Sequence, residues 1–203
     1  ELPSPGRVVV LGRLQVLLPS QAHPLVQIRM DALGVLDVSA ETVSLDATLY
    51  DSKILQFPLT GDMALRAGWG RQPQFVLAIG GFHPRFAPPP GLPALQRLAL
   101  QLADGDSLQL RCQAYLAVTS NTVQFGARVD LHAAGGGFSF DGMLGFDAIL
   151  QLAPLAFEVD VGAALALRYH GRLLMGISFK GRLAGPTPWQ VAGKAKIKLL
   201  FFS

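Results

Sequence analysis

The chain has 203 residues, of which 50% are hydrophobic and only 15% are charged, and its formal net charge at pH 7 is +3. The hydrophobic content excludes intrinsic disorder, and so small a net charge gives no reason to expect a nucleic-acid partner. The single cysteine, Cys112, excludes a disulfide framework and an all-cysteine zinc site.

The first part of the chain, residues 1–82, contains short segments in which hydrophobic and polar residues alternate. This alternation is typical of β-strands, because successive side chains of a strand point to opposite faces of the sheet. The segments predicted as strands are 7–18, 25–38, 42–50, 53–57, 60–68 and 74–80. We therefore expect residues 1–82 to form the first half of a β-sheet.

A proline-rich connector, residues 83–100, interrupts this pattern. Its prolines are Pro84, Pro88, Pro89, Pro90 and Pro93. Proline has no backbone N–H to donate and is therefore excluded from central strands. Proline is favoured in the first turn of a helix, and leucines at a spacing of three surround Pro93. The pattern predicts one short helix near residues 92–99.

The last part of the chain, residues 101–203, has a regular rhythm. Turn-forming residues such as Gly, Pro and Asn separate six segments in which apolar and polar residues alternate strictly. Short turns favour antiparallel pairing, since parallel strands need long crossovers. The predicted fold class is all-β: an antiparallel meander of long amphipathic strands in one domain or two fused halves. The sheet is expected to form a curled sheet, an open trough or a barrel.

One face of these long strands is apolar, and it is the main functional signal in the sequence. We predict an apolar-ligand face made by Phe125, Val129, Phe138, Phe140, Phe146, Phe157, Val161, Leu165, Ile177, Phe179, Trp189 and Ile197. Such a face needs a cover. The sheet can close on itself as a sandwich or barrel, it can bind lipid or dock neighbouring segments as an open trough, or it can form a membrane barrel or pore.

A basic stripe lies near the end of the chain. Lys194, Lys196 and Lys198 are spaced by two, which places them on one face of one strand. They could contact anionic lipid headgroups, which makes membrane contact one expectation. They could equally protect an edge strand against sheet-to-sheet aggregation.

Signals for an enzyme or a metal site are weak. None of the four histidines, His23, His83, His132 and His170, has a metal-ligand partner at a helical or short-loop spacing. The acids around Asp141 and Asp147 could form a glycosidase pair or a calcium site, but interspersed basic residues favour a solvated face. We predict no catalytic residues, no metal and no cofactor.

The segment from Thr119 onward and the segment GGFHPRFAPPPGLPALQRLAL resemble an uncharacterised domain family of very large, β-rich bacterial proteins. The phrases GFDA at 145–148 and GPTPW at 185–189 carry the resemblance. It implies a bacterial source and a longer parent chain, of which this sequence is a piece, and it brings no catalytic residues. The long-strand pattern alone is also similar to bridge-like lipid-transfer proteins with repeated β-grooves.

These observations predict a non-enzymatic binding or scaffold module whose partners are lipid, another apolar ligand or neighbouring segments of a larger protein. The alternatives are a self-closed structural module of a large bacterial assembly and a membrane barrel or pore segment. No signal peptide and no apolar run long enough for a membrane helix is visible, so the sequence does not indicate a compartment.

Overall fold

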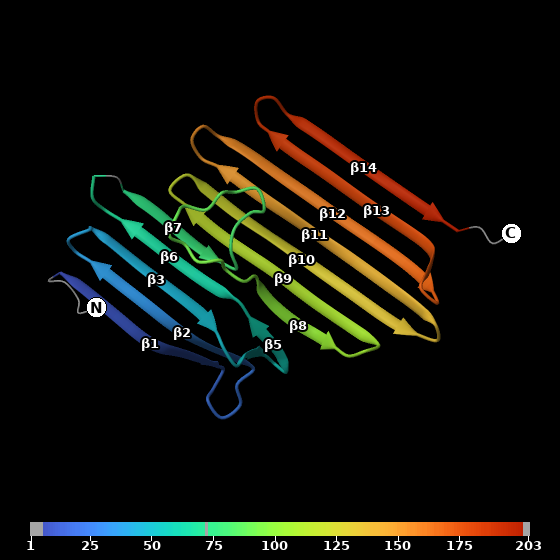
Figure 1. The fold of residues 1–203 in the computed structure, drawn as a ribbon, viewed down its shortest axis with the longest axis horizontal. Helices are drawn as coiled ribbons and strands as arrows, with labels where there is room; N and C mark the ends of the chain where they lie inside the picture. Colours follow the sequence, from blue (N-terminus) through green and yellow to red (C-terminus); the bar gives the residue numbers. More distant parts are fainter. Residues whose placement is uncertain (1–5, 72, 201–203) are drawn as a thin grey trace.

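The structure is a computed structural model that describes residues 6–71 and 73–200, and these residues form one antiparallel sheet of fourteen strands (Figure 1). The strands are β1 (Arg7–Leu18), β2 (Val26–Asp37), β3 (Thr42–Leu49), β4 (Ser52–Ile54), β5 (Phe57–Thr60), β6 (Asp62–Gly68), β7 (Gln74–Ile79), β8 (Leu98–Asp104), β9 (Leu108–Thr119), β10 (Thr122–Gly135), β11 (Phe138–Gln151), β12 (Ala156–Tyr169), β13 (Arg172–Gly185) and β14 (Gln190–Leu199). The predicted all-β, antiparallel meander is thereby confirmed.

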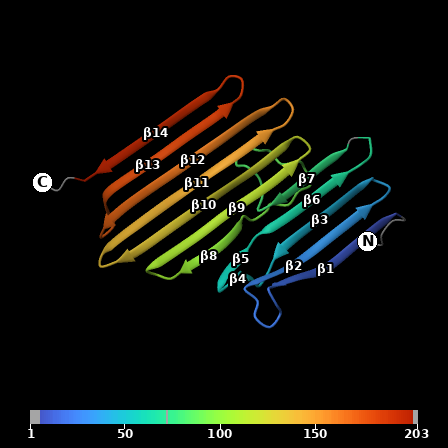
Figure 2. The same ribbon diagram turned by 180° about the vertical axis from the view of Figure 1, so that it is seen from behind.

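The strands from β9 to β14 follow one another in space in chain order, each paired with the next. Strands β10 to β13 have 14 residues each, which corresponds to roughly 46 Å at about 3.3 Å per residue. Every predicted turn of residues 101–203 lies between or at the ends of these strands. In both views β1 and β14 lie at opposite edges, so the described strands form an open sheet (Figures 1 and 2).

The middle of the sheet is divided into two tiers. The first residues of β9 pair with β8, and its last residues pair with β7. Strand β2 is shared in the same way, by β3 along most of its length and by β4 at its start. The tiers β3–β6–β7 and β4–β5–β8 therefore bridge the same two long strands.

The predicted helix near residues 92–99 is wrong, because no helix occurs in residues 6–71 and 73–200. Residues 92–97 are irregular, and Leu98 begins β8. The Gln96 N–H donates to Asp62 Oδ2 at 2.9 Å, and the Gln96 carbonyl accepts from the Asp62 N–H at 3.2 Å. These bonds to the start of β6 use the backbone groups of Gln96 that a helix would need.

The predicted single strand 53–57 is instead a tight hairpin of β4 and β5. Leu55, at its turn, has a positive φ of 58°, a conformation that interrupts an extended strand. The Leu55 N–H donates to the Leu25 carbonyl at 2.5 Å, which ties this turn to the start of β2.

The proline-rich segment 80–97 crosses one face of the sheet and creates the buried core of the fold (Figure 1). The most buried side chains lie in the strands β6, β7, β9 and β10 beneath and beside it. They include Ala64, Ala78, Tyr115, Ala117 and Gln124. Because small side chains dominate this core, most of the large apolar side chains of the chain remain outside it.

Candidate functional site: an uncovered apolar sheet face

The apolar-ligand face predicted from the sequence lies on one side of the sheet. In the strand register, Phe146 lies opposite Val161, while Ile177 lies between Leu165 and Ile197. Alternate positions of β10 and β11 continue the same face, with Val129 opposite Leu144. The eleven predicted residues that lie in strands share this face, and Trp189 is in the turn that leads into β14.

The apolar face also extends across the first half of the chain, which the prediction did not include. One row of paired residues crosses it from β1 to β13. The row consists of Val10, Gly34, Leu45, Leu65, Leu77, Val118, Val123, Leu150, Phe157 and Gly185. Side chains in register on adjacent strands point to the same side of a sheet, so the apolar face is continuous across it.

The side chains of the apolar face are exposed to an unusual degree. Phe125 is 45% exposed, Leu144 59% and Ile197 68%. Within residues 6–71 and 73–200, no second layer of chain packs on this side, since segment 80–97 lies on the opposite face. Contiguous apolar surface is unusual on soluble proteins, which makes this face the candidate functional site.

Two aromatic rings of the apolar face, those of Phe157 and Phe179, lie against glycines of the same or a neighbouring strand. A methyl group built on Gly181 would lie 3.0 Å from the Phe179 ring, and one built on Gly185 would lie 3.1 Å from the Phe157 ring. Trp189 packs edge-on against Phe157 with ring centroids 5.1 Å apart. Each of these rings occupies the space that a side chain larger than glycine would fill. The apolar face is therefore flatter at these glycines.

The opposite face is polar, and most of its charged side chains are paired. Arg66 donates to both carboxylate oxygens of Asp46, at 2.8 and 2.9 Å. Asp141 accepts from Arg168 and interacts with His132 at 2.7 Å, and the His132 hydrogen bond together with the nearby Arg168 charge lowers the pKa of Asp141. These contacts agree with the solvated, cross-paired face expected for the acids.

The basic stripe lies on this polar face, on β14 at one edge of the described sheet. Lys196 is opposite Ser178, and Lys194 is opposite Lys180, whereas the apolar Ile197 is opposite Ile177. A lipid whose acyl chain lies on the apolar face would therefore have its headgroup on the other side of the sheet from the lysines. The placement favours protection of an edge strand over headgroup binding.

Arg97 joins the two ends of segment 80–97 and contacts the polar face of the sheet through Tyr115. Its guanidinium donates to the carbonyls of Gly80 at 2.9 Å and Phe82 at 2.8 Å, and lies 3.9 Å from the centre of the Tyr115 ring. The Tyr115 hydroxyl donates to Asp147 Oδ1 at 3.0 Å, and burial raises the pKa of Tyr115. Beside this contact lies an open hollow of about 510 Å³.

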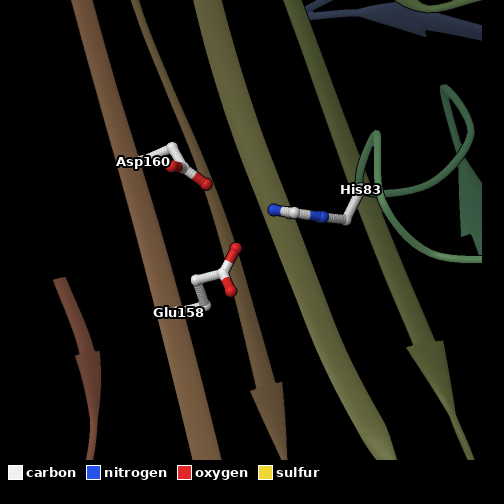
Figure 3. A group of neighbouring side chains, drawn as sticks. All are labelled: His83, Glu158 and Asp160. Carbon is white, nitrogen blue, oxygen red and sulfur yellow. The ribbon is translucent and has the colours of Figure 1, made fainter. Parts of the chain in front are cut away.

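A second anchor of segment 80–97 brings together residues that are distant in the sequence. Figure 3 shows His83 pointing toward Glu158 and Asp160, which both project from β12. Arg85 forms ion pairs with both acids, and Glu158 also pairs with Arg182. His83, Glu158 and Asp160 each offer one ligand atom within 4.8 Å of the others, so they could hold a metal ion. The sequence contains no local spacing that indicates this cluster.

Gly126, on the polar face of β10, is required for the close packing of Tyr115. A methyl group at this position would overlap the Tyr115 ring and would lie 2.7 Å from the Phe146 carbonyl oxygen. We expect Gly126→Ala to lower the free energy of unfolding by about 1–3 kcal/mol, measured by urea denaturation. Gly135→Ala in the same strand is the control, because nothing lies within 4 Å of its added methyl. Equal stability of the two variants would contradict this packing.

The described part of the chain contains no helix that is long and apolar enough to span a membrane. Neither the curated proteins nor the solved structures contain a match to the chain. The model of one protein family does match it, over residues 1–203, and that family is described as a family of unknown function, DUF6603. The resemblance to an uncharacterised domain family is thereby confirmed, and the chain belongs to the DUF6603 family.

Proposed function

We propose that this chain is a non-enzymatic binding module that holds lipid acyl chains, or another long apolar ligand, against the apolar face of its sheet. The observation that carries the proposal is the row of apolar residues that crosses the sheet from β1 to β13, which no other described part of the chain covers. Removing apolar surface from water contributes about 25 cal/mol per Å², so a covering ligand is strongly favoured.

The composition of the apolar face supports a ligand that is itself apolar. From Val123 to Ala133, every second residue is Val, Phe, Ala or Leu, and the same positions from Phe140 to Leu150 are Phe, Gly, Leu or Ala. A ligand on this surface gains contact area and finds no side-chain hydrogen-bond donor in these strands. The surface is also flat where the rings lie over glycines. A flat apolar surface can accept a flexible acyl chain in several positions.

Because the lysine stripe is on the opposite face, binding should depend little on the charge of the headgroup. The test is native mass spectrometry of delipidated protein after incubation with vesicles of phosphatidylcholine or of phosphatidylglycerol. We expect adducts of phospholipid mass with both lipids, in similar amounts. Identical masses for delipidated and vesicle-treated protein would overturn the lipid proposal.

A second protein layer is the other candidate cover, and the single-layer architecture favours it. Domains ordinarily pack two layers around one core, and two sheets can stack face to face at about 10 Å. The second layer would be another copy of the chain or a neighbouring segment of a larger protein. Light scattering on delipidated protein distinguishes the candidates, because a dimer without lipid supports stacking and a monomer supports the lipid proposal.

A further inference from the structure

His83 is buried in a way that calls for a partner. It is only 3% exposed, and among the described residues its Nε2 atom has no hydrogen-bond partner. Leaving a buried polar atom unpaired costs about 1–3 kcal/mol, and such atoms in native proteins often mark the position of a water or an ion. The ring points toward the carboxylates of Glu158 and Asp160 (Figure 3).

The position of His83 is set by the core of the protein. The backbone N–H of His83 donates to Gln124 Oε1 at 3.0 Å, and the side-chain amide nitrogen of Gln124 donates to Thr122 Oγ1 at 2.9 Å. Gln124 is fully buried in β10. Glu158 and Asp160 are two residues apart in β12, so both project from the same face of that strand. The three side chains therefore converge from rigid elements.

We propose that His83, Glu158 and Asp160 form a binding site for a divalent transition metal ion of the Zn²⁺ type. His83 Nε2 and one carboxylate oxygen from each acid are the ligands, and water completes the coordination. Metal–ligand bonds of about 2.0–2.2 Å place ligand atoms at most about 4.4 Å apart. The observed limit of 4.8 Å between these atoms needs only a small movement of the side chains.

The ligand set favours a transition metal over calcium or magnesium. Imidazole nitrogen suits zinc and its neighbours, whereas calcium and magnesium prefer oxygen ligands alone. An imidazole must be neutral to bind a metal, and the burial of His83 disfavours its charged form.

Arg85 occupies this site as its cation when metal is absent. Its guanidinium pairs with both carboxylates, and the backbone N–H of Arg85 donates to His83 Nδ1 at 3.2 Å. A metal on Nε2 places a proton on Nδ1, so the hydrogen bond from the Arg85 backbone N–H must break as the ion binds. The guanidinium must leave the carboxylates as well, and the Arg85 side chain is 46% exposed, which leaves it room to withdraw into solvent. Metal and Arg85 therefore compete for the same carboxylates.

A metal ion at this site would connect segment 80–97 to β12. The site lies on the polar face, opposite the apolar-ligand face. It is independent of lipid binding, and either proposal can fail without the other. The metal ion would link the connector to the long-strand half of the sheet and would stabilise the folded chain by an amount that rises with the free metal concentration.

Calorimetric titration of the purified chain with ZnCl₂, and visible absorption with Co²⁺, test the site. We expect one bound ion per chain and a drop in affinity of at least about tenfold in His83→Asn. His132→Asn is the matched control, because His132 forms the other histidine–carboxylate pair of the polar face. Its Zn²⁺ affinity should equal that of the unaltered chain.

Arg85→Ala supplies a test that a folding defect cannot imitate. Removal of the competing guanidinium should make Zn²⁺ bind more tightly than in the unaltered chain. The proposal is overturned by unaltered Zn²⁺ affinity in His83→Asn, by a loss of binding in His132→Asn, by equal or weaker binding in Arg85→Ala, or by Ca²⁺ binding as tightly as Zn²⁺.

Discussion

Introducing aspartate at Ile177 and Phe179 together should weaken the binding of acyl chains by at least about 100-fold while the sheet remains folded. Both side chains lie on the apolar face of β13 and are already exposed, at 37% and 44%. A ligand that covers them would have to bury two carboxylates without partners. That penalty is several kcal/mol, and each 1.4 kcal/mol corresponds to a factor of ten in affinity.

The control places the same change of net charge on the other face of the same strand. Ser178→Asp with Lys180→Gln alters the two residues that alternate with Ile177 and Phe179 along β13. Fluorescence titration with a fatty-acid probe should give near-normal affinity for this control and almost no binding for the apolar-face variant. Equal losses in the two variants would show that the ligand does not lie on the apolar face.

The same pair of variants examines the stacked-sheet candidate. If a second copy covers the apolar face, the aspartates at Ile177 and Phe179 should turn a dimer into a monomer, since both copies would present charges at one interface. The Ser178 and Lys180 control should stay dimeric. Light scattering thus reports the cover of the apolar face even when no lipid is present.

The long-strand half of the fold could be predicted because its determinants are local. Alternation of period two defines each strand and its apolar face, and two-residue turns such as His170-Gly171 leave only the adjacent strand as partner. The register that joins Phe146 to Val161 follows from the turn positions. In this region each strand pairs with the next one along the chain. The strands and their pairing could therefore be predicted from local patterns alone.

The middle of the sheet was predicted less well because its pairing is non-local. Strands β7 and β8 share β9, and no periodicity in the sequence indicates which half of a long strand each will take. The false helix near residues 92–99 has the same origin. Leucine spacing indicated a local structure, but Gln96 bonds to Asp62 in a different element.

The candidate sites also differ in whether local sequence patterns define them. The apolar-ligand face was predicted in the second half of the chain, while the row through Leu45 and Leu65 was missed because β3 and β6 are short. The cluster of His83, Glu158 and Asp160 depends on the path of segment 80–97 across the sheet, which no spacing in the sequence encodes. The prediction of no metal site rested on the absence of ligands that are close along the chain, and these three residues are distant in the sequence.

Removing the Arg97 side chain should loosen segment 80–97, whose two ends it joins, and lower the free energy of unfolding by about 3–5 kcal/mol. The guanidinium makes two hydrogen bonds to carbonyls, each worth about 1.5–3 kcal/mol when the donor is charged, and a cation–π contact with Tyr115 worth up to about 2 kcal/mol. Arg97→Ala would leave the Gly80 and Phe82 carbonyls without these donors.

Urea denaturation and hydrogen exchange together measure this effect. Arg111→Ala, which removes an exposed arginine from the polar face of the adjacent β9, should change stability by no more than about 0.5 kcal/mol. Arg97→Lys should recover only part of the loss, because one ammonium group lacks the planar fork that reaches both carbonyls and the ring. Faster exchange should be concentrated at the backbone N–H of His83, which depends on the segment staying in place. If Arg97→Ala and Arg111→Ala unfold at the same urea concentration, then contacts other than Arg97 hold the segment on the sheet.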